Sequence, residues 1–243
     1  MELMNILSLF DGISCGRVAL NKANIKYKKY YASEIDKYAI KIAQKNYTNT
    51  IQIGDVLSVN GKDLPKIDLL IGGSPCQGFS FAGKQLNFND PRSALFFEYV
   101  RILREVNPKY FLLENVKMKQ EYQDVISDLL GVKPILINSN LVSAQNRKRL
   151  YWTNIPIKNL PEDKNIKLQD IIETTVEEKY YINGGRAEWL KKFGEIKEQR
   201  GYIAFNPHKA KCLTVRREPS WNTTYIVQMP HGTNNGGYKS DGW

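Results

Sequence analysis

The residue with the clearest potential for chemistry is Cys76, which stands directly after a proline at the end of an apolar, strand-like run. The sequence from Leu69 to Gly83 reads LLIGGSPCQGFSFAG, and the chain has only three cysteines. Pro75 and the neighbouring glycines predict an exposed loop with a restricted backbone, whereas a structural cysteine is normally buried among apolar residues. Because a free thiol is intrinsically very nucleophilic, we expect Cys76 to act as a nucleophile.

A carboxyl group and two guanidinium groups follow later in the chain. Glu114 ends a second apolar run, LLENV, and Arg147 and Arg149 lie in the basic run QNRKRLYW. A carboxyl group in an enclosed site can keep its proton near neutral pH and donate it. The two arginines share a face if their segment is extended, where they could bind a carbonyl group and a phosphate. Taken singly, these features also fit a helix start and a solvated basic surface.

A glycine turn, with Gly12 and Gly16, follows the first apolar run in LSLFDGISCG. Its spacing does not match the dinucleotide pattern G-x-G-x-x-G, and a tight connection is the simpler alternative. Glu34 ends the next strand-like run, where a carboxylate can accept hydrogen bonds from ribose hydroxyls. Asp55 follows the third run, where it could accept from an adenine amino group. Together they predict an adenosine pocket without a phosphate-binding site, which favours S-adenosylmethionine over a nicotinamide cofactor.

These residues require a scaffold of alternating strands and helices. Periodicity predicts helices at residues 15–23, 36–47, 93–106 and 122–130, and strands at residues 5–10, 29–33, 50–56, 67–73, 110–116, 134–139 and 149–155. Continuous apolar strands between amphipathic helices predict the α/β class, with a doubly wound, mostly parallel, Rossmann-like sheet covered on both faces. Ligands of such sheets bind beyond the carboxyl ends of the strands, where the residues discussed above lie.

The composition restricts the class of protein. The formal net charge is +10, which suggests a polyanionic partner and leaves nucleic acid and a solvated basic surface both open. Three dispersed cysteines without a C-x-x-C pair, and only two histidines, argue against a metal site and favour reduced thiols. No stretch approaches the ~20 apolar residues of a membrane span. We therefore expect a cytoplasmic protein without a membrane segment.

The character of the sequence changes after about Ile155. The remainder has weak periodicity, many charges, scattered aromatic residues and an end rich in turn formers, MPHGTNNGGYKSDGW. We predict one domain over residues 1–155 and a smaller, irregular, basic region over residues 156–243.

Seven blocks of this sequence resemble the cytosine-5 DNA methyltransferases. They are FDGISCG, SEID, GDV, GGSPCQGFSFAG, DPRSALFFE, ENV and QNRKRLYW, which occur in the family's order and cover roughly Asn5 to Thr153. The first block and the long basic tail are similar to those of small bacterial or phage members. The resemblance implies double-stranded DNA as partner, S-adenosylmethionine as methyl donor, and a restriction–modification setting in a bacterial or phage-infected cell.

The resemblance also implies residue roles. Cys76 would be the nucleophile, Glu114 would contact ring nitrogen 3 of cytosine, and Arg149 its carbonyl oxygen, with Arg147 supporting the loop and the negative charge. The implied contacts with S-adenosylmethionine come from Phe10, Asp11, Gly12, Ile13, Gly16, Glu34, Ile35, Asp55, Val56, Pro75 and Leu95. Those with the DNA substrate come from Gln77, Ser80, Asn115 and Gln145.

The implied reaction explains why these residue types are needed. Carbon 5 of cytosine is too electron-poor to take a methyl group until a thiolate adds at carbon 6 and a proton is shared at nitrogen 3. Loss of the carbon-5 proton then expels Cys76. The base must leave the helical stack for this chemistry, at a cost of about a few kcal/mol.

The resemblance weakens towards the end of the chain. Family members continue with an arginine- and proline-bearing block and a glycine–asparagine block, and we find neither. We therefore expect residues 156–243 to be part of a target-recognition region, completed by a further C-terminal segment or a second polypeptide. A tRNA cytosine-5 methyltransferase and a non-catalytic DNA-binding subunit that depends on a partner chain remain alternatives. A nicotinamide dehydrogenase is disfavoured by the glycine spacing.

Overall fold

The structure is a computed structural model that describes residues 3–75, 91–173, 175–182, 184–212 and 223–226. The chain forms two compact units. The first consists of Met1–Ile137 and Lys148–Asn159, and the second of Asn138–Arg147 and Leu160–Trp243. The chain passes from the first unit to the second for the last time after Asn159, which is close to the boundary predicted near residue 156. The assignment of residues 138–147 to the second unit was not predicted.

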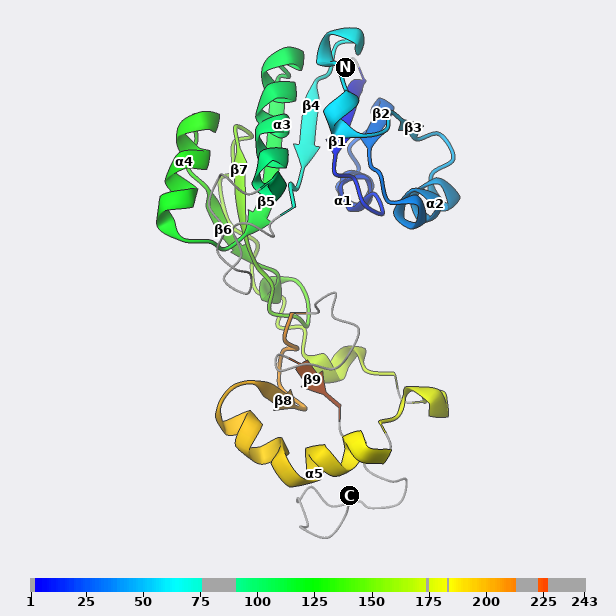
Figure 1. Ribbon diagram of the computed structural model, residues 1–243, viewed down its shortest axis with the longest axis vertical. Coiled ribbons are helices and arrows are strands. Elements are labelled where there is room, and N and C mark those ends of the chain that lie inside the picture. Colours follow the sequence, from blue (N-terminus) through cyan, green and yellow to red (C-terminus); the bar gives the residue numbers. More distant parts are fainter. Residues whose placement is uncertain (1–2, 76–90, 174, 183, 213–222, 227–243) are drawn as a thin grey trace. The chain divides into compact units, whose positions relative to one another are not determined.

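The strands of the first unit form one seven-stranded sheet in the order β3-β2-β1-β4-β5-β7-β6 (Figure 1). Neighbours among β1 to β5 are parallel, and β7 runs antiparallel to β5. The mostly parallel, doubly wound sheet is thus confirmed. Its order reverses between β1 and β4, where ligands of such sheets bind. The strands are β1 (Met4–Leu9), β2 (Tyr27–Ser33), β3 (Ile51–Gln52), β4 (Leu69–Gly72), β5 (Tyr110–Val116), β6 (Ile135–Asn138) and β7 (Lys148–Thr153).

The helices of the first unit lie where periodicity predicts them. They are α1 (Cys15–Lys22), α2 (Lys37–Asn46), α3 (Pro91–Val106) and α4 (Gln120–Leu130). Asp36 caps α2 by accepting hydrogen bonds from two backbone amides, and α4 ends at Gly131 with φ 69°. Two short 3-10 turns, η1 (Val56–Ser58) and η2 (Gly61–Asp63), follow β3. No helix in the described ranges combines the length and the apolar character that crossing a membrane requires.

Strand β3 is shorter than the predicted strand at residues 50–56. Its pairing with β2 covers only Ile51 and Gln52. The chain then turns at Gly54, with φ 79°, and Asp55 caps η1 through a hydrogen bond from the backbone amide of Leu57. The local capping chemistry therefore ends the strand before the apolar pattern does.

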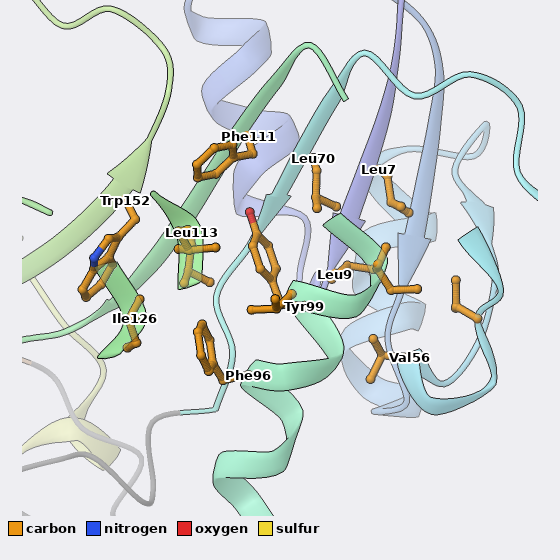
Figure 2. Close-up of a cluster of buried hydrophobic side chains, with 14 of the residues drawn as sticks. Leu7, Leu9, Val56, Leu70, Phe96, Tyr99, Phe111, Leu113, Ile126 and Trp152 are labelled. Atoms are coloured by element: carbon orange, nitrogen blue, oxygen red, sulfur yellow. The ribbon is translucent and has the colours of Figure 1, made fainter. Parts of the chain in front are cut away.

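Alternate strand residues pack against opposite faces of the sheet, as a period of two requires. The larger core lies between the sheet and helices α3 and α4 (Figure 2). Each large apolar side chain buried there contributes about 1.5–3 kcal/mol. Its members include Leu7, Leu9, Leu70, Phe96, Tyr99, Phe111, Leu113, Ile126 and Trp152. A smaller cluster beside α1 contains Ile6, Leu20, Tyr30, Ala32 and Leu69.

The second unit contains one long helix and a short parallel strand pair. Its elements are η3 (Ser139–Leu141), η4 (Leu168–Ile171), η5 (Glu178–Tyr180), α5 (Gly184–Gln199), β8 (Ile203–Phe205) and β9 (Thr223–Tyr225). Leu190, Ile203 and Tyr225 form its buried cluster. Helix α5 was not predicted, although Trp189, Leu190 and Phe193 have helical spacing.

Lys209 connects residues 138–147 with the rest of the second unit. Its Nζ atom donates hydrogen bonds to the backbone oxygens of Asn140 at 2.7 Å, Ser143 at 3.1 Å and Ile166 at 2.7 Å. One ammonium group therefore joins the two stretches of chain that form this unit.

Candidate active site

Glu114 and Arg149 form an ion pair at the carboxyl end of β5. The distance from Arg149 Nε to Glu114 Oε1 is 2.8 Å. Arg149 on β7 pairs with Val116 on β5, so Glu114, two residues before Val116, is its diagonal neighbour on the same face. The Glu114 side chain remains 33% exposed, against 15% for Arg149. The strand register thus places an accessible carboxyl group beside a cation.

The loop that leads towards Cys76 packs against these residues. A Cβ atom on Gly73 would lie only 3.1 Å from Glu114 Oε2, so a side chain here would displace the carboxylate or the loop. The buried Asn115 amide donates to the backbone oxygen and hydroxyl of Ser74, at 3.4 and 3.3 Å, and accepts from the backbone amide of Val116 at 2.8 Å. The predicted substrate ligand Asn115 therefore uses its side chain within the protein, where it positions the loop.

Three predicted residues of this loop, Cys76, Gln77 and Ser80, lie outside the described residues. Pro75 is the last described residue before them and is half-buried. Their roles stay predictions.

Glu34 at the end of β2 is held by three backbone amides. Its Oε2 atom accepts from Gly12 at 2.7 Å, and its Oε1 atom accepts from Ile35 at 2.8 Å and Asp36 at 2.9 Å. An ionised carboxylate has about four acceptor positions, so one position on Oε2 remains for a ligand. This geometry provides an oriented acceptor for a ribose hydroxyl.

Exposed apolar side chains and a second carboxylate accompany Glu34 at the carboxyl ends of the strands. Ile35 is 73% exposed, Leu57 is 61% exposed and Ile13 is 50% exposed. Asp55 is half-buried and uses its Oδ1 atom to accept from the Leu57 amide at 3.0 Å. Within the described part of the chain its other oxygen has no hydrogen-bond partner. Apolar side chains with one such acceptor fit a planar base that carries an amino group.

Four other predicted cofactor ligands make contacts within the protein, and their ligand roles stay predictions. The Asp11 carboxylate is buried and accepts hydrogen bonds from Ser14 Oγ and from the Tyr30 hydroxyl, the latter at 2.8 Å. The Val56 side chain is 4% exposed within the larger core, against which the half-buried Phe10 and Leu95 pack. Because the core buries the Val56 side chain, its predicted contact with the cofactor would have to come from the backbone, and this role stays a prediction. Both oxygens of the Asp11 carboxylate likewise accept hydrogen bonds from within the protein.

Gly16 permits the close approach of α1 to the sheet. A Cβ atom at this position would lie 2.3 Å from Ile71 Cδ1 on β4. This agrees with the predicted helix start close to the sheet.

The two arginines of QNRKRLYW differ in their strand assignment. Strand β7 begins at Lys148, so only Arg149 lies within it. Arg147 belongs to the second unit, where its Nη1 atom lies 3.4 Å from Cys212 Sγ. The predicted ligand Gln145 also lies in that unit and bridges to Ala210. The strand assignment therefore covers Arg149 alone, and the shared face of the two arginines stays a prediction.

A further arginine, which sequence analysis missed, holds the segment after β3. Arg101 on α3 donates to the backbone oxygens of Val56 at 3.1 Å and Val59 at 2.9 Å. It also pairs with Glu98 at 2.6 Å and Glu105 at 2.9 Å. Burial opposes ionisation of Glu105, but hydrogen bonds from Arg101 and a backbone amide lower the pKa of this carboxyl group. Glutamates three before and four after an arginine on one helix could have suggested this cluster.

Relatives of this chain are found among phage and bacterial enzymes. The orphan methyltransferase M.SPRI of Bacillus phage SPR is 39% identical over 189 residues, which cover 71% of this chain and 43% of the relative. The type II methyltransferase M.HpaII of Haemophilus parainfluenzae is 34% identical over 224 residues, which cover 82% of this chain and 62% of the relative. The chain spans about half the length of the first curated relatives it matches.

Solved structures and a family model agree with this relationship. The S. pombe Dnmt2 methyltransferase structure matches 95% of this chain and 78% of its own, with a TM-score of 0.69 at 21% identity, which supports the fold. The Spodoptera frugiperda DNMT2 mutant structure matches 87% of this chain and 70% of its own, with a TM-score of 0.62 at 24% identity. The model of C-5 cytosine-specific DNA methylases matches residues 4–231. By this match, which extends over most of its length, the chain belongs to the C-5 cytosine-specific DNA methylase family.

Proposed function

We propose that this chain transfers a methyl group from S-adenosylmethionine to carbon 5 of cytosine in double-stranded DNA. The observation that carries the proposal is the ion pair of Glu114 and Arg149, which lies against Gly73 in the loop that leads to Cys76. A carboxylate and a cation beside a nucleophile loop can stabilise the proton and the negative charge that activation of a pyrimidine ring requires. Membership of the family supports the same reaction.

The strand ends fit S-adenosylmethionine. Glu34 has one acceptor position left for a ribose hydroxyl, Asp55 has an oxygen available for the adenine amino group, and Ile35 offers an exposed apolar surface. When bound, the cofactor supplies an electrophilic methyl group. The backbone of Gly12 and the side chains of Ile13 and Pro75 complete the proposed contacts.

The side chains of this chain activate the cytosine. The Cys76 thiolate adds to carbon 6, while ring nitrogen 3 takes up a proton from solvent that the Glu114 carboxylate holds there by a hydrogen bond, and Arg149 holds the carbonyl oxygen. The displaced electron pair makes carbon 5 nucleophilic. After methylation of carbon 5, loss of its proton restores the ring double bond and releases the Cys76 thiolate.

Duplex DNA is the proposed substrate and the second unit is its proposed recognition part. A formal net charge of +10 favours association with phosphate groups, and the target base must leave the stack to be methylated. We also keep as proposals the participation of a second polypeptide and activity in the cytoplasm of a bacterial or phage-infected cell.

Methylation assays with tritium-labelled S-adenosylmethionine test the proposed function. We expect incorporation into duplex DNA but not into a tRNA transcript, and its loss in Cys76→Ser. Cys15→Ser is the matched control, because Cys15 is an exposed cysteine outside the proposed catalytic groups. DNA that contains 5-fluorocytosine should trap a covalent adduct with the parent chain and with Cys15→Ser, but not with Cys76→Ser. Incorporation above background that is equal in the parent chain and in Cys76→Ser would refute the proposed mechanism.

A further inference from the structure

A buried hydrogen-bonded group lies beneath the turn after β1. Asp11 is 8% exposed, Tyr30 is 1% exposed and Ser14 is fully buried. The Tyr30 hydroxyl donates to Asp11 Oδ1 at 2.8 Å, and Ser14 Oγ donates to Asp11 Oδ2. Each carboxylate oxygen therefore has a hydroxyl donor from within the protein, one local and one from the neighbouring strand.

The backbone of this turn needs such support. Phe10, Gly12 and Ser14 have φ values of 56°, 57° and 63°, so three of five consecutive residues are left-handed. Residues with a Cβ atom rarely adopt this conformation and keep it only where surrounding structure holds it. Asp11 supplies contacts on both sides, because its backbone amide also donates to the Ser33 oxygen at 3.1 Å.

The conformation of the turn determines the geometry of the cofactor acceptor. The Gly12 amide lies between the left-handed residues Phe10 and Ser14 and donates to Glu34 Oε2 at 2.7 Å. That oxygen is the one with an acceptor position left for a ligand. A change in the turn would therefore reorient the Glu34 carboxylate or remove one of its donors.

Tyr30 is itself fixed by a buried arginine. The Arg17 guanidinium lies 5.0 Å from the centre of the Tyr30 ring and also faces the rings of Tyr27 and Tyr47, at 5.4 and 4.5 Å. Burial and, secondarily, the negative charge of Asp11 raise the pKa of Tyr30 well above its usual range. The Tyr30 hydroxyl therefore stays protonated and remains a donor.

We infer that Tyr30 is a positioning residue for the cofactor site: acting through Asp11, its hydroxyl holds the turn after β1 in the conformation that orients Glu34 towards the ribose. This inference deepens the proposed function and rests on its cofactor. It assigns the Asp11 carboxylate a role inside the protein in place of a direct ligand contact.

Calorimetry with S-adenosylmethionine on Tyr30→Phe tests the inference. The variant removes one oxygen and keeps the ring that faces Arg17. We expect affinity to fall about tenfold, as loss of a hydrogen bond to a charged group typically produces. In methylation assays the KM for S-adenosylmethionine should rise, while kcat at saturating cofactor stays unchanged.

Tyr27→Phe is the matched control. Its hydroxyl accepts from Arg17 Nε at 2.7 Å and donates to Asn21 Oδ1 at 3.2 Å, without contacting Asp11. It should keep the parent affinity for the cofactor even if its thermal stability falls. Ser14→Gly removes the second donor to Asp11 while tolerating the positive φ, so it should weaken binding as well.

The outcomes separate the inference from the proposed function. Parent-like affinity in Tyr30→Phe, or an equal loss in Tyr27→Phe, would overturn the positioning role while leaving methyl transfer intact. If the parent chain does not bind S-adenosylmethionine, both fail. Should Tyr30→Phe not fold, Ser14→Gly decides: weakened binding supports the inference, and unchanged binding overturns it.

Discussion

The turns after β1 and β4 end neighbouring parallel strands, with Leu9 paired to Gly72, yet they are held by different means. After β1, a left-handed backbone is supported from beneath by the Asp11 carboxylate and its two hydroxyl donors. After β4, the loop is held from the next strand, through the Asn115 amide and close packing against Glu114.

This difference predicts that cofactor binding and catalysis depend on different residues. The first turn is linked to β2 through Tyr30 and presents Glu34, whereas the second is linked to β5 and lies beside Glu114. Changes in β5 should therefore move the candidate proton donor together with the nucleophile loop and leave cofactor affinity intact. Changes around Tyr30 should do the reverse.

The largest expected effect comes from Glu114→Gln. Loss of a general acid or base typically slows a reaction about 10²- to 10⁴-fold, and the substitution also removes the charge that Arg149 pairs with. Cofactor affinity should stay within about twofold, since Glu114 belongs to the β5 side of the comparison. Single-turnover methylation and calorimetry measure the two effects. Glu121→Gln, an exposed carboxylate on α4, should match the parent chain, and an active Glu114→Gln would contradict the assignment.

A smaller effect is expected for Asn115→Ala. The change leaves the buried Ser74 groups and the Val116 amide without their partner, at a cost of about 1–3 kcal/mol in the free energy of unfolding. Because the nucleophile loop loses its attachment, kcat should also fall.

Asn154→Ala is the control for this variant. Asn154 accepts from the Phe111 amide at 2.9 Å and donates to the Lys109 oxygen at 3.0 Å, near the opposite end of β5. Asn154→Ala should lower the free energy of unfolding about as much as Asn115→Ala does, but it should leave kcat unchanged. Urea unfolding and steady-state kinetics compare the two, and an equal loss of kcat would remove the positioning role of Asn115.

The variants Gly73→Ala and Gly16→Ala should again distinguish the turn after β4 from the turn after β1. A Cβ atom on Gly73 would press on Glu114 Oε2 at 3.1 Å, so kcat should fall several-fold with little loss of stability. A Cβ atom on Gly16 would meet Ile71 Cδ1 at 2.3 Å, and such overpacking costs about 1–3 kcal/mol. Gly73→Ala should therefore lower kcat more than it lowers the unfolding temperature, whereas Gly16→Ala should lower the unfolding temperature more than it lowers kcat. A stable, fully active Gly73→Ala would show that the loop does not position Glu114.

Sequence patterns predicted the part of the molecule that local chemistry determines. Apolar runs and helical periodicity located the strands and helices of the first unit. Each of these elements has a regular pattern of apolar residues on one face or on both faces. Parallel strands share one carboxyl edge, so Glu34 and Glu114 could be assigned to that edge from their positions at strand ends. The pairing of Glu114 with Arg149 then follows from the register of β5 and β7.

Contacts between residues distant in sequence could not be predicted in the same way. The inward orientation of Asp11 depends on Tyr30, a partner on another strand. Arg147 lies just before the first residue of β7, and residues 138–147 contact the rest of the second unit through distant residues such as Lys209. Nothing in the local pattern around these residues identifies their partners.

The smallest expected effect concerns Tyr99, the buried tyrosine next to the turn after β4. A Cβ atom on Gly72 would lie 3.0 Å from its ring, and its hydroxyl lies in the larger core (Figure 2) without a hydrogen-bond partner in the described part of the chain. Unlike Tyr30→Phe, Tyr99→Phe should therefore leave cofactor affinity and kcat unchanged. It should maintain the free energy of unfolding or raise it by about 1 kcal/mol, because an unsatisfied buried group is removed. Burial raises the pKa of Tyr99 in the folded state, so unfolding releases its proton above pH about 10 and stability falls as the pH rises past that value. Urea unfolding between about pH 9 and pH 11 should show a shallower loss in Tyr99→Phe. A variant that is less stable at neutral pH would mean that the Tyr99 hydroxyl makes a stabilising contact, and that the two turns are more alike than their described hydrogen bonds suggest.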